Sequence, residues 1–215
     1  MARIVFDLDG TLIDSAPDIR AAANRVLERN GITPLSLEET RSFIGSGAPV
    51  FIERVGAARG LTQADLPRYL SGFLDGYEQA VDLTVVYDGV RDALGVLQSR
   101  GHRLGICTNK PIAPARAVLA HLDLARHFDC VIGGDSLSSR KPDPAPLRAA
   151  LEGLGEGEAL YVGDSDIDAA TALAAGVPFL LYTEGYLHVA ADTLTSAAEF
   201  TRFEDLPHLV EQALL

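Results

Sequence analysis

The order of apolar runs along this chain restricts its fold more than any other feature. Five short runs, rich in β-branched and aromatic residues and followed by turn residues, predict buried strands. They lie at 3–8, 103–107, 129–132, 159–163 and 178–182. Stretches with helical periodicity lie between the later runs, at 89–100, 111–121, 143–153 and 166–175. This alternation predicts a doubly wound α/β fold with a mainly parallel, Rossmann-like sheet as its core.

One interval, 15–84, interrupts the alternation. It has no strand-like run, but it contains several signals that are typical of helix starts. These are Ser15 ahead of Pro17, the Ser36–Glu39 capping box, and Thr62 followed by Asp65. We therefore predict an α/β core domain from 1–14 and 85–215, and an inserted all-helical cap from 15–84. The cap leaves the core after the first strand, so it should lie over the carboxyl end of the sheet, where open α/β sheets bind ligands.

A net charge of −12 limits the partners of this 215-residue chain. Its field repels nucleic acid and anionic lipid surfaces over about a Debye length, so neither is an expected partner, and no obligate protein partner is indicated. We find no run long enough to cross a bilayer and no signal peptide, and we predict a cytoplasmic protein. Cys107 and Cys130 are expected to be free thiols in or beside apolar runs. An anionic substrate would need local attraction from a lysine, a helix N-terminus or a metal ion.

Two acidic residues end the first predicted strand, in the segment VFDLDGTLID. Side chains two apart in extended chain point the same way, so Asp7 and Asp9 would share one face. Carboxylates that close repel each other unless a cation lies between them or one is protonated. The plain alternative is an acidic turn ahead of Gly10. Four flanking apolar residues favour a functional pair.

A second pair of acids, Asp164 and Asp168, follows the strand-like run of YVGDSDIDAA. Their spacing of four puts them on adjacent turns of the next helix, and Gly163 would let the backbone approach a ligand closely. Helix N-capping by Asp164 is the simpler alternative. Acids from two strand ends would make an all-oxygen site of the kind that magnesium prefers.

All but two of the 18 basic residues are arginine, and the two lysines, Lys110 and Lys141, lie in strand-end loops. A compact ammonium fits beside a carboxylate where an arginine fork could be too large; the plain alternative is chance placement. Thr108 and Asn109 add a hydroxyl and an amide suited to phosphate oxygens. The loops therefore carry the local cations that an anionic substrate needs.

These residues fall in chain order at four predicted strand ends, within FDLDGTLIDS, CTNKP, GGDSLSSRKPDPAPL and YVGDSDIDAATALAAGVPFLLYTEGY, and the cap adds FIGSGAP. Over nearly its full length the chain resembles the haloacid dehalogenase superfamily, and within it the phosphoglycolate phosphatases. The resemblance implies hydrolysis of 2-phosphoglycolate to glycolate and phosphate through an aspartyl-phosphate. Asp7 would attack phosphorus, and Asp9 would protonate the leaving alkoxide and then activate water.

The resemblance also implies a Mg²⁺ cofactor, held by the Asp7 carboxylate, the backbone carbonyl of Asp9 and the Asp164 carboxylate. The phosphoryl oxygens would be held by Thr108, Asn109 and Lys141, of which Lys141 would also offset the charge of Asp7. Asp168 would order either a metal-bound water or Lys141.

Selectivity is expected to come from the cap. Gly45-Ser46-Gly47 precede a predicted helix whose first amides would receive an anion such as a substrate carboxylate, so Ser46 and Gly47 are candidate substrate contacts. Arg54 is a further candidate, and Arg41 also flanks the turn. For any single cap arginine, a solvated surface position is the commoner outcome.

Other functions remain open at this stage. A phosphatase of another small ester, such as a sugar phosphate, would use the same core residues. A dehalogenase has no need of Asp9. A phosphonatase-like enzyme would need a lysine in the cap, and the related sugar phosphomutases resemble enzymes that use one, whereas this cap has no lysine. A receiver-type signalling domain also gathers acids, a threonine and a lysine, but it would be phosphorylated on a central strand and would lack a cap.

Overall fold

A parallel sheet forms the core of the molecule. We describe residues 1–214 from a computed structural model. The strands of the core sheet are β1 (Ala2–Phe6), β4 (Arg103–Cys107), β5 (Cys130–Ile132), β6 (Glu158–Gly163), β7 (Phe179–Tyr182) and β8 (Ala198–Phe200). Their order is β5-β4-β1-β6-β7-β8, and every neighbouring pair is parallel. The predicted α/β fold with a mainly parallel sheet is confirmed; β8, at the edge, was not predicted.

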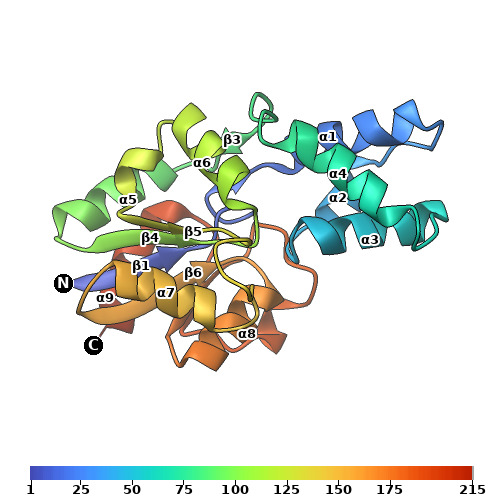
Figure 1. The fold of residues 1–215 in the computed structure, drawn as a ribbon. Helices are drawn as coiled ribbons and strands as arrows, with labels where there is room; N and C mark the ends of the chain where they lie inside the picture. Colours follow the sequence, from blue (N-terminus) through green and yellow to red (C-terminus); the bar gives the residue numbers. More distant parts are fainter. Residues whose placement is uncertain (215) are drawn as a thin grey trace.

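Helices cover both faces of this sheet, as the doubly wound prediction requires (Figure 1). One face packs against α5 (Val90–Ser99), α6 (Ile112–His121) and α9 (Leu206–Ala213), and the other against α7 (Ala145–Gly153) and α8 (Asp166–Ala175). The sequence of β1 shows why. Ile4 and Phe6 enter the first apolar cluster and Val5 enters the second, because successive strand residues point to opposite faces. The central strand therefore has an unbroken apolar run.

The cap helices lie together beyond the carboxyl end of the sheet (Figure 1). They are α1 (Ala16–Arg29), α2 (Leu37–Phe43), α3 (Ala48–Arg59) and α4 (Leu66–Tyr77). They pack around their own apolar cluster, to which Phe51 and Phe73 contribute. The chain leaves and re-enters the core through β2 (Ile13–Asp14) and β3 (Val85–Val86), which pair antiparallel. This pair ties the two connections together.

The predicted helix starts have different outcomes. The capping box between Ser36 and Glu39 is formed at the start of α2. Ser15 precedes α1, but its hydroxyl caps nothing and instead donates to Asp9 Oδ1 at 2.5 Å. Thr62 was expected to open a helix, yet it only closes a turn with Asp65, and α4 begins after that turn. A polar residue near a helix start can therefore serve another partner.

Two further expectations concern the chain as a whole. Cys107 and Cys130 are free thiols, as predicted. Among the helices of residues 1–214, none combines the length and the apolar character needed to cross a membrane.

Candidate active site

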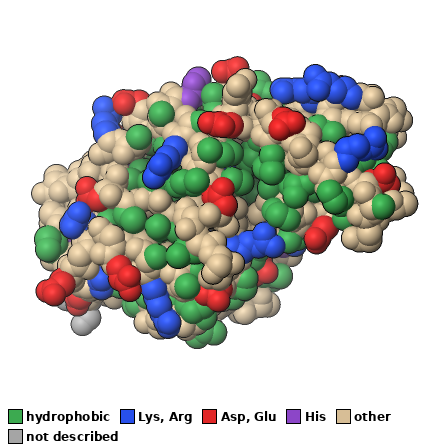
Figure 2. Space-filling view, viewed as in Figure 1, with side chains coloured by type: hydrophobic (Ala, Val, Ile, Leu, Met, Phe, Trp, Pro, Cys, Tyr) green, Lys and Arg blue, Asp and Glu red, His purple; other side chains and the backbone are tan. Residues whose placement is uncertain are grey.

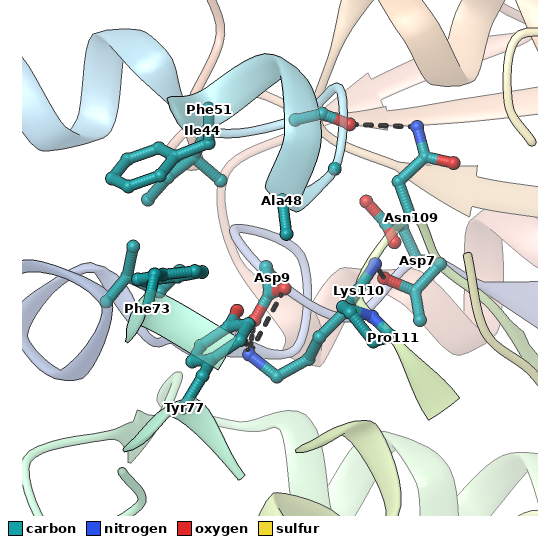
Figure 3. A pocket seen from close by; sticks show the side chains of 14 residues that line it. Asp7, Asp9, Ile44, Ala48, Phe51, Phe73, Tyr77, Asn109, Lys110 and Pro111 are labelled. Atoms are coloured by element: carbon teal, nitrogen blue, oxygen red, sulfur yellow. Dashed lines mark hydrogen bonds and ion pairs between the residues drawn. The ribbon is translucent and has the colours of Figure 1, made fainter. Parts of the chain in front are cut away.

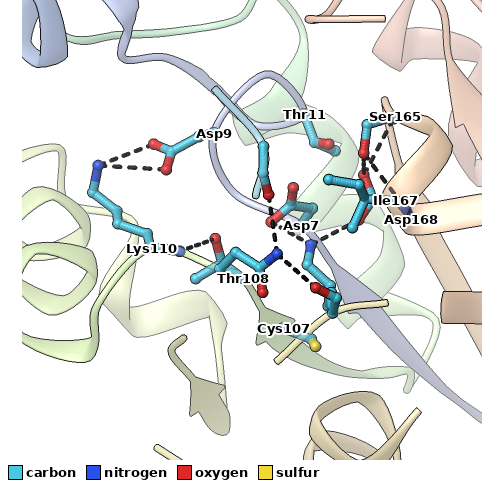
Figure 4. Close-up of polar contacts among 12 residues, drawn as sticks. Asp7, Asp9, Thr11, Cys107, Thr108, Lys110, Ser165, Ile167 and Asp168 are labelled. Atoms are coloured by element: carbon cyan, nitrogen blue, oxygen red, sulfur yellow. Dashed lines mark hydrogen bonds and ion pairs between the residues drawn. The ribbon is translucent and has the colours of Figure 1, made fainter. Parts of the chain in front are cut away.

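The carboxyl ends of three neighbouring strands and one nearby loop bring the predicted polar residues together (Figure 4). Asp7 and Asp9 follow β1, Thr108 and its neighbours follow β4, and Asp164 follows β6. Because β4 and β6 flank β1, the three strand ends meet at one edge. Lys141 joins them from the loop between β5 and α7.

Asp7 lies at the centre of this group. Asp7 is 7% exposed, and its backbone N–H donates to Val162 O at 2.9 Å, which fixes the strand end. The Nζ of Lys141 lies 3.0 Å from Asp7 Oδ1, an oxygen that has no hydrogen bond of good geometry within the described chain. Burial raises the pKa of Asp7 to about 7, although Lys141 opposes the rise. Full ionisation at neutral pH therefore calls for more positive charge than Lys141 supplies.

Lys141 is enclosed by core groups, and its side chain is 1% exposed. Besides Asp7, its Nζ donates to Asp168 Oδ1 at 2.7 Å and to the Tyr161 hydroxyl at 2.9 Å. Two of the three N–H groups of the ammonium are thus used, and Asp7 is an ion-pair partner of the same nitrogen without a hydrogen bond of good geometry. The arrangement favours neutralising and orienting Asp7, and the contact between Lys141 and phosphoryl oxygens stays a prediction.

Asp168 holds Lys141 in place. Its Oδ1 accepts from Lys141 and from Tyr161, and its Oδ2 accepts from the Ser165 hydroxyl at 2.6 Å in the capping box of α8. A Cβ on Gly163 would lie 2.6 Å from Asp168 Cγ. The glycine thus makes room for Asp168, rather than for a ligand as the sequence suggested. Of the two expected partners of Asp168, the structure shows Lys141.

Asp164 is buried beside Asp7, and it does not cap α8, because Ser165 occupies that position. Its Oδ1 accepts from the Thr11 hydroxyl at 2.5 Å and its Oδ2 from the Tyr186 N–H at 2.7 Å. Burial is the main cause that raises the pKa of Asp164 well above its usual range, and the neighbouring carboxylates add to it. Gly10, at φ 89°, leaves room for it, since a Cβ there would overlap Asp164 Oδ2.

One oxygen from each of Asp7, Asp164 and Asp168 lies within 4.8 Å of the others, and all three residues are buried. Such an oxygen-only set suits a hard divalent cation. Asp168 is already paired with the Lys141 ammonium, whereas the partners of Asp164 are the neutral Thr11 hydroxyl and Tyr186 N–H, and Asp7 Oδ1 has no hydrogen bond of good geometry. The charges therefore fit a metal held by Asp7 and Asp164 rather than by Asp168.

Asp9 is held by two donors. Besides Ser15, the Nζ of Lys110 lies 3.1 Å from Asp9 Oδ1 (Figure 4). Lys110 was noted in the sequence as one of only two lysines, but no role was assigned to it. Tyr77 of α4, which accepts from Lys110 at 2.6 Å, carried no signal that separates it from other apolar cap residues.

The predicted phosphate ligands Thr108 and Asn109 differ in what they can still bind. The Thr108 oxygen accepts from the backbone N–H of Lys110 at 3.2 Å, which leaves its hydroxyl proton for an acceptor. Asn109 Nδ2 donates to Gly45 O and to Lys141 O, both at 3.0 Å. Both amide protons are used, so the side chain ties the cap to the Lys141 loop, and the expected contact of this side chain with phosphate is not supported.

A cavity of about 430 Å³, including its open mouth, joins these groups to the cap. The core supplies a polar floor and the cap a mainly apolar roof (Figure 3). The floor consists of Asp7, Asp9, Thr108, Asn109, Lys110 and Pro111. The roof consists of Ile19, Ile44, Gly45, Gly47, Ala48, Phe51, Phe73 and Tyr77.

The cap turn before α3 lies over this floor. Gly45 and Gly47 line the cavity, and Gly47, at φ 87°, precedes the first residue of α3. Ser46 and Arg54 are not among the lining residues. Arg54 donates to Phe43 O at 2.9 Å and to Ser46 Oγ at 3.2 Å, so the two side chains brace the turn, and their expected contact with substrate is not supported. Arg41 pairs with Asp14 at 2.7 Å instead.

A second hollow lies between the cap and the core, beside the loops that follow β4 and β5. It is lined mainly by apolar residues such as Pro49 and Leu74 of the cap and Pro111 and Pro114 of the core, and Arg140 is its basic residue. Apolar side chains are also visible around the middle of the molecule in Figure 2, among scattered acidic and basic ones.

A sheet with carboxylates at its β1 end, a hydroxyl at its β4 end, a buried lysine and an inserted cap defines a class of hydrolases. The chain belongs to the haloacid dehalogenase-like hydrolases, whose family model matches residues 4–182. It is 49% identical to the phosphoglycolate phosphatase of Cereibacter sphaeroides over the full length of both chains. It is 45% identical to that of Rhodobacter capsulatus, over 97% of this chain and 96% of the relative.

Solved structures agree with this assignment. The crystal structure of a predicted phosphoglycolate phosphatase from Haemophilus somnus superposes with a TM-score of 0.88. The two sequences are 29% identical, and the match covers 96% of each chain.

Proposed function

We propose that this protein is a phosphoglycolate phosphatase that hydrolyses 2-phosphoglycolate to glycolate and phosphate. The observation that carries the proposal is the Asp7 carboxylate, which is buried against Lys141 and lines the cavity between the strand ends and the cap. Relatives that match over nearly their full length are named phosphoglycolate phosphatase, and this supports the choice of substrate.

In the first half-reaction, an oxygen of Asp7 forms a bond to phosphorus while the bond between phosphorus and the ester oxygen breaks. The leaving glycolate oxygen takes a proton from Asp9, which Ser15 and Lys110 hold at the cavity wall. Lys141 keeps Asp7 oriented and offsets its charge, so an anionic substrate can approach.

In the second half-reaction, Asp9 takes a proton from water as the water oxygen attacks phosphorus. The bond between phosphorus and Asp7 breaks, and phosphate and the free carboxylate result. The Thr108 hydroxyl, whose proton is available, donates to a phosphoryl oxygen in both steps.

Mg²⁺ is part of the proposal. Asp7, Asp164 and the backbone carbonyl of Asp9 would hold it, and the buried oxygen-only cluster supports this choice. When bound, the ion supplies positive charge that offsets the negative charge of the phosphoryl group and of Asp7. Asp168 keeps Lys141 beside Asp7 and away from the solvent.

The main alternative is a phosphatase of sugar phosphates. A sugar presents several hydroxyl groups, each of which would need a polar partner. The cap side of this cavity offers few, because its roof includes Ile19, Ile44, Phe51 and Phe73. The cavity therefore favours a small leaving group over a polyhydroxylated one. The cytoplasmic location and the absence of macromolecular partners stay predictions from composition.

A trapping experiment tests the covalent route. Asp9→Asn removes the proton donor and the later base, so we expect phospho-enzyme to accumulate when the variant meets Mg²⁺ and 2-phosphoglycolate. Peptide mass spectrometry after acid quench should find one added phosphoryl group on Asp7. Asp7→Asn is the matched control and should show no adduct and no turnover. Turnover by Asp7→Asn, with no adduct in either variant, would contradict the mechanism.

A substrate panel tests the choice of substrate. Wild-type kcat/KM for 2-phosphoglycolate should exceed the value for glucose 6-phosphate and for ethyl phosphate. A higher value for the sugar phosphate would favour the alternative and leave the core mechanism intact.

A further inference from the structure

Lys110 lies where the polar floor of the cavity meets the apolar roof. Its side chain is 4% exposed, and its Nζ lies 3.1 Å from Asp9 Oδ1 and 2.6 Å from the Tyr77 hydroxyl. The same nitrogen lies 4.4 Å from the centre of the Tyr77 ring. Figure 3 shows the side chain running along the cavity toward Asp9 and Tyr77. The ammonium is thus anchored to the core on one side and to cap helix α4 on the other.

Lys110 is the single lysine or arginine among the residues that line this cavity. Lys141 is not in the lining, and it is enclosed by Asp7, Asp168 and Tyr161. Lys110 has two partner groups: the Asp9 carboxylate, whose Oδ1 and Oδ2 lie 3.1 and 3.5 Å from Nζ, and the Tyr77 hydroxyl. The 3.5 Å contact is longer than an ordinary N–H···O bond, so one of the three N–H groups is available to an acceptor inside the cavity.

Support of Asp9 alone does not account for this lysine. Ser15 already donates to Asp9 at 2.5 Å, and burying an ammonium is unfavourable unless several partners satisfy it. An anionic group of the substrate would be a further partner that compensates the buried charge of the Lys110 ammonium.

We infer that Lys110 receives the carboxylate of the substrate and so determines which phosphate esters the enzyme prefers. The inference rests on the proposed function. When the ester oxygen lies at Asp9 for protonation, the carboxylate carbon of glycolate is two bonds away from it, on the side of the cavity that Lys110 shares with Asp9. Tyr77 holds the ammonium in place and adds its ring face to the charge.

The alternative receptor is the cap turn, whose predicted anion contact is the first backbone amides of α3. Gly47 and Ala48 line the cavity there, whereas the side chains of Arg54 and Ser46 are outside the lining and bind each other. Lys110 differs from these amides in carrying a full positive charge, and the roof residues Phe51 and Phe73 offer a carboxylate no donor.

Three esters of nearly equal size test the inference, because their leaving groups differ in charge. They are 2-phosphoglycolate, ethyl phosphate and phosphoethanolamine, with an anionic, a neutral and a cationic end. Wild-type kcat/KM should fall in that order. In Lys110→Met, the ratio between 2-phosphoglycolate and ethyl phosphate should shrink by about ten- to a hundred-fold, the value of one charge-assisted contact. Phosphoethanolamine should gain relative to ethyl phosphate.

The ratios decide the question, since loss of the Asp9 partner would lower all three rates by one common factor. A common factor with unchanged ratios would overturn the inference and leave Lys110 as a support of Asp9. Lys110→Gln, which keeps a hydrogen bond to Tyr77, provides a second uncharged variant if the methionine variant does not fold.

Two control variants separate the remaining explanations. Tyr77→Phe keeps the ammonium and the ring but removes the hydroxyl that holds the ammonium, so its ratio between 2-phosphoglycolate and ethyl phosphate should lie between those of the wild type and Lys110→Met. Arg54→Met should also keep the ratios; a collapse there, with Lys110→Met unaffected, would assign the carboxylate to the cap turn. Failure of the proposed function looks different, because the wild type itself would then show no preference for 2-phosphoglycolate.

Discussion

The buried lysine at position 141 gives a prediction whose size follows from its surroundings. Lys141→Met preserves the length and most of the volume of the side chain but removes the charge. It leaves two buried carboxylates, Asp7 and Asp168, without their shared cation. Removing one partner of a buried ion pair destabilises a protein by about 3–5 kcal/mol. The free energy of unfolding of a native protein is about 5–15 kcal/mol in total, so the effect is large.

The destabilisation should depend on pH, and its sign follows from Asp7. Burial already raises the pKa of Asp7 to about 7, against 3.8 for a free group, and loss of Lys141 removes a cause that lowers it. When the pKa of a carboxyl is higher in the folded than in the unfolded protein, the folded protein is fully stable below the unfolded pKa. Its free energy of unfolding then falls as the pH rises through the folded pKa. Lys141→Met should therefore lose most stability at pH 8 and less at pH 5.

Urea unfolding in EDTA, followed by circular dichroism at both pH values, measures this difference. Lys110→Met is the matched control, because it removes the other lysine, which pairs with Asp9 and not with Asp7. Its loss of stability should therefore not follow the titration of Asp7. For Lys141→Met, a loss below about 1 kcal/mol at pH 8, typical of a surface ion pair, would refute the reasoning. An equal loss at both pH values would refute the role of Asp7 in it.

Three further predictions follow from neighbouring contacts. Without metal, stability should fall as pH rises through 7, because burial raises the pKa of Asp7 and Asp164; Mg²⁺ should therefore raise the Tm more at pH 8 than at pH 5, as thermal scans will show. Asn109→Ala removes the link between Gly45 O and the Lys141 loop, so kcat/KM should fall by about ten-fold with the fold intact, and an unchanged value would argue against the link. Ser15→Ala should lower kcat by about ten-fold, because Asp9 loses a donor, whereas unchanged kcat would show that the contact is dispensable.

The sequence determined the architecture of this protein and the positions of its acids. Ile4, Val5 and Phe6 form an unbroken apolar run because β1 is buried on both faces, and Asp7 follows at the strand end. Such signals are local: they depend on the period of a strand or helix, which a short window of residues contains. Strand β8 was missed because it is a three-residue edge strand with an exposed Glu199.

Only the tertiary structure decided what each polar side chain does. Lys110 and Lys141 look alike in the sequence, yet one faces the cavity with Asp9 and Tyr77, and the other is enclosed with Asp7 and Asp168. Residues 101 positions apart form the contact between Lys110 and Asp9. A hydrogen-bonding group has few donors, and distant neighbours determine which of them remain free for a ligand. No local pattern records those neighbours, so the roles of the two lysines became visible only in the folded chain.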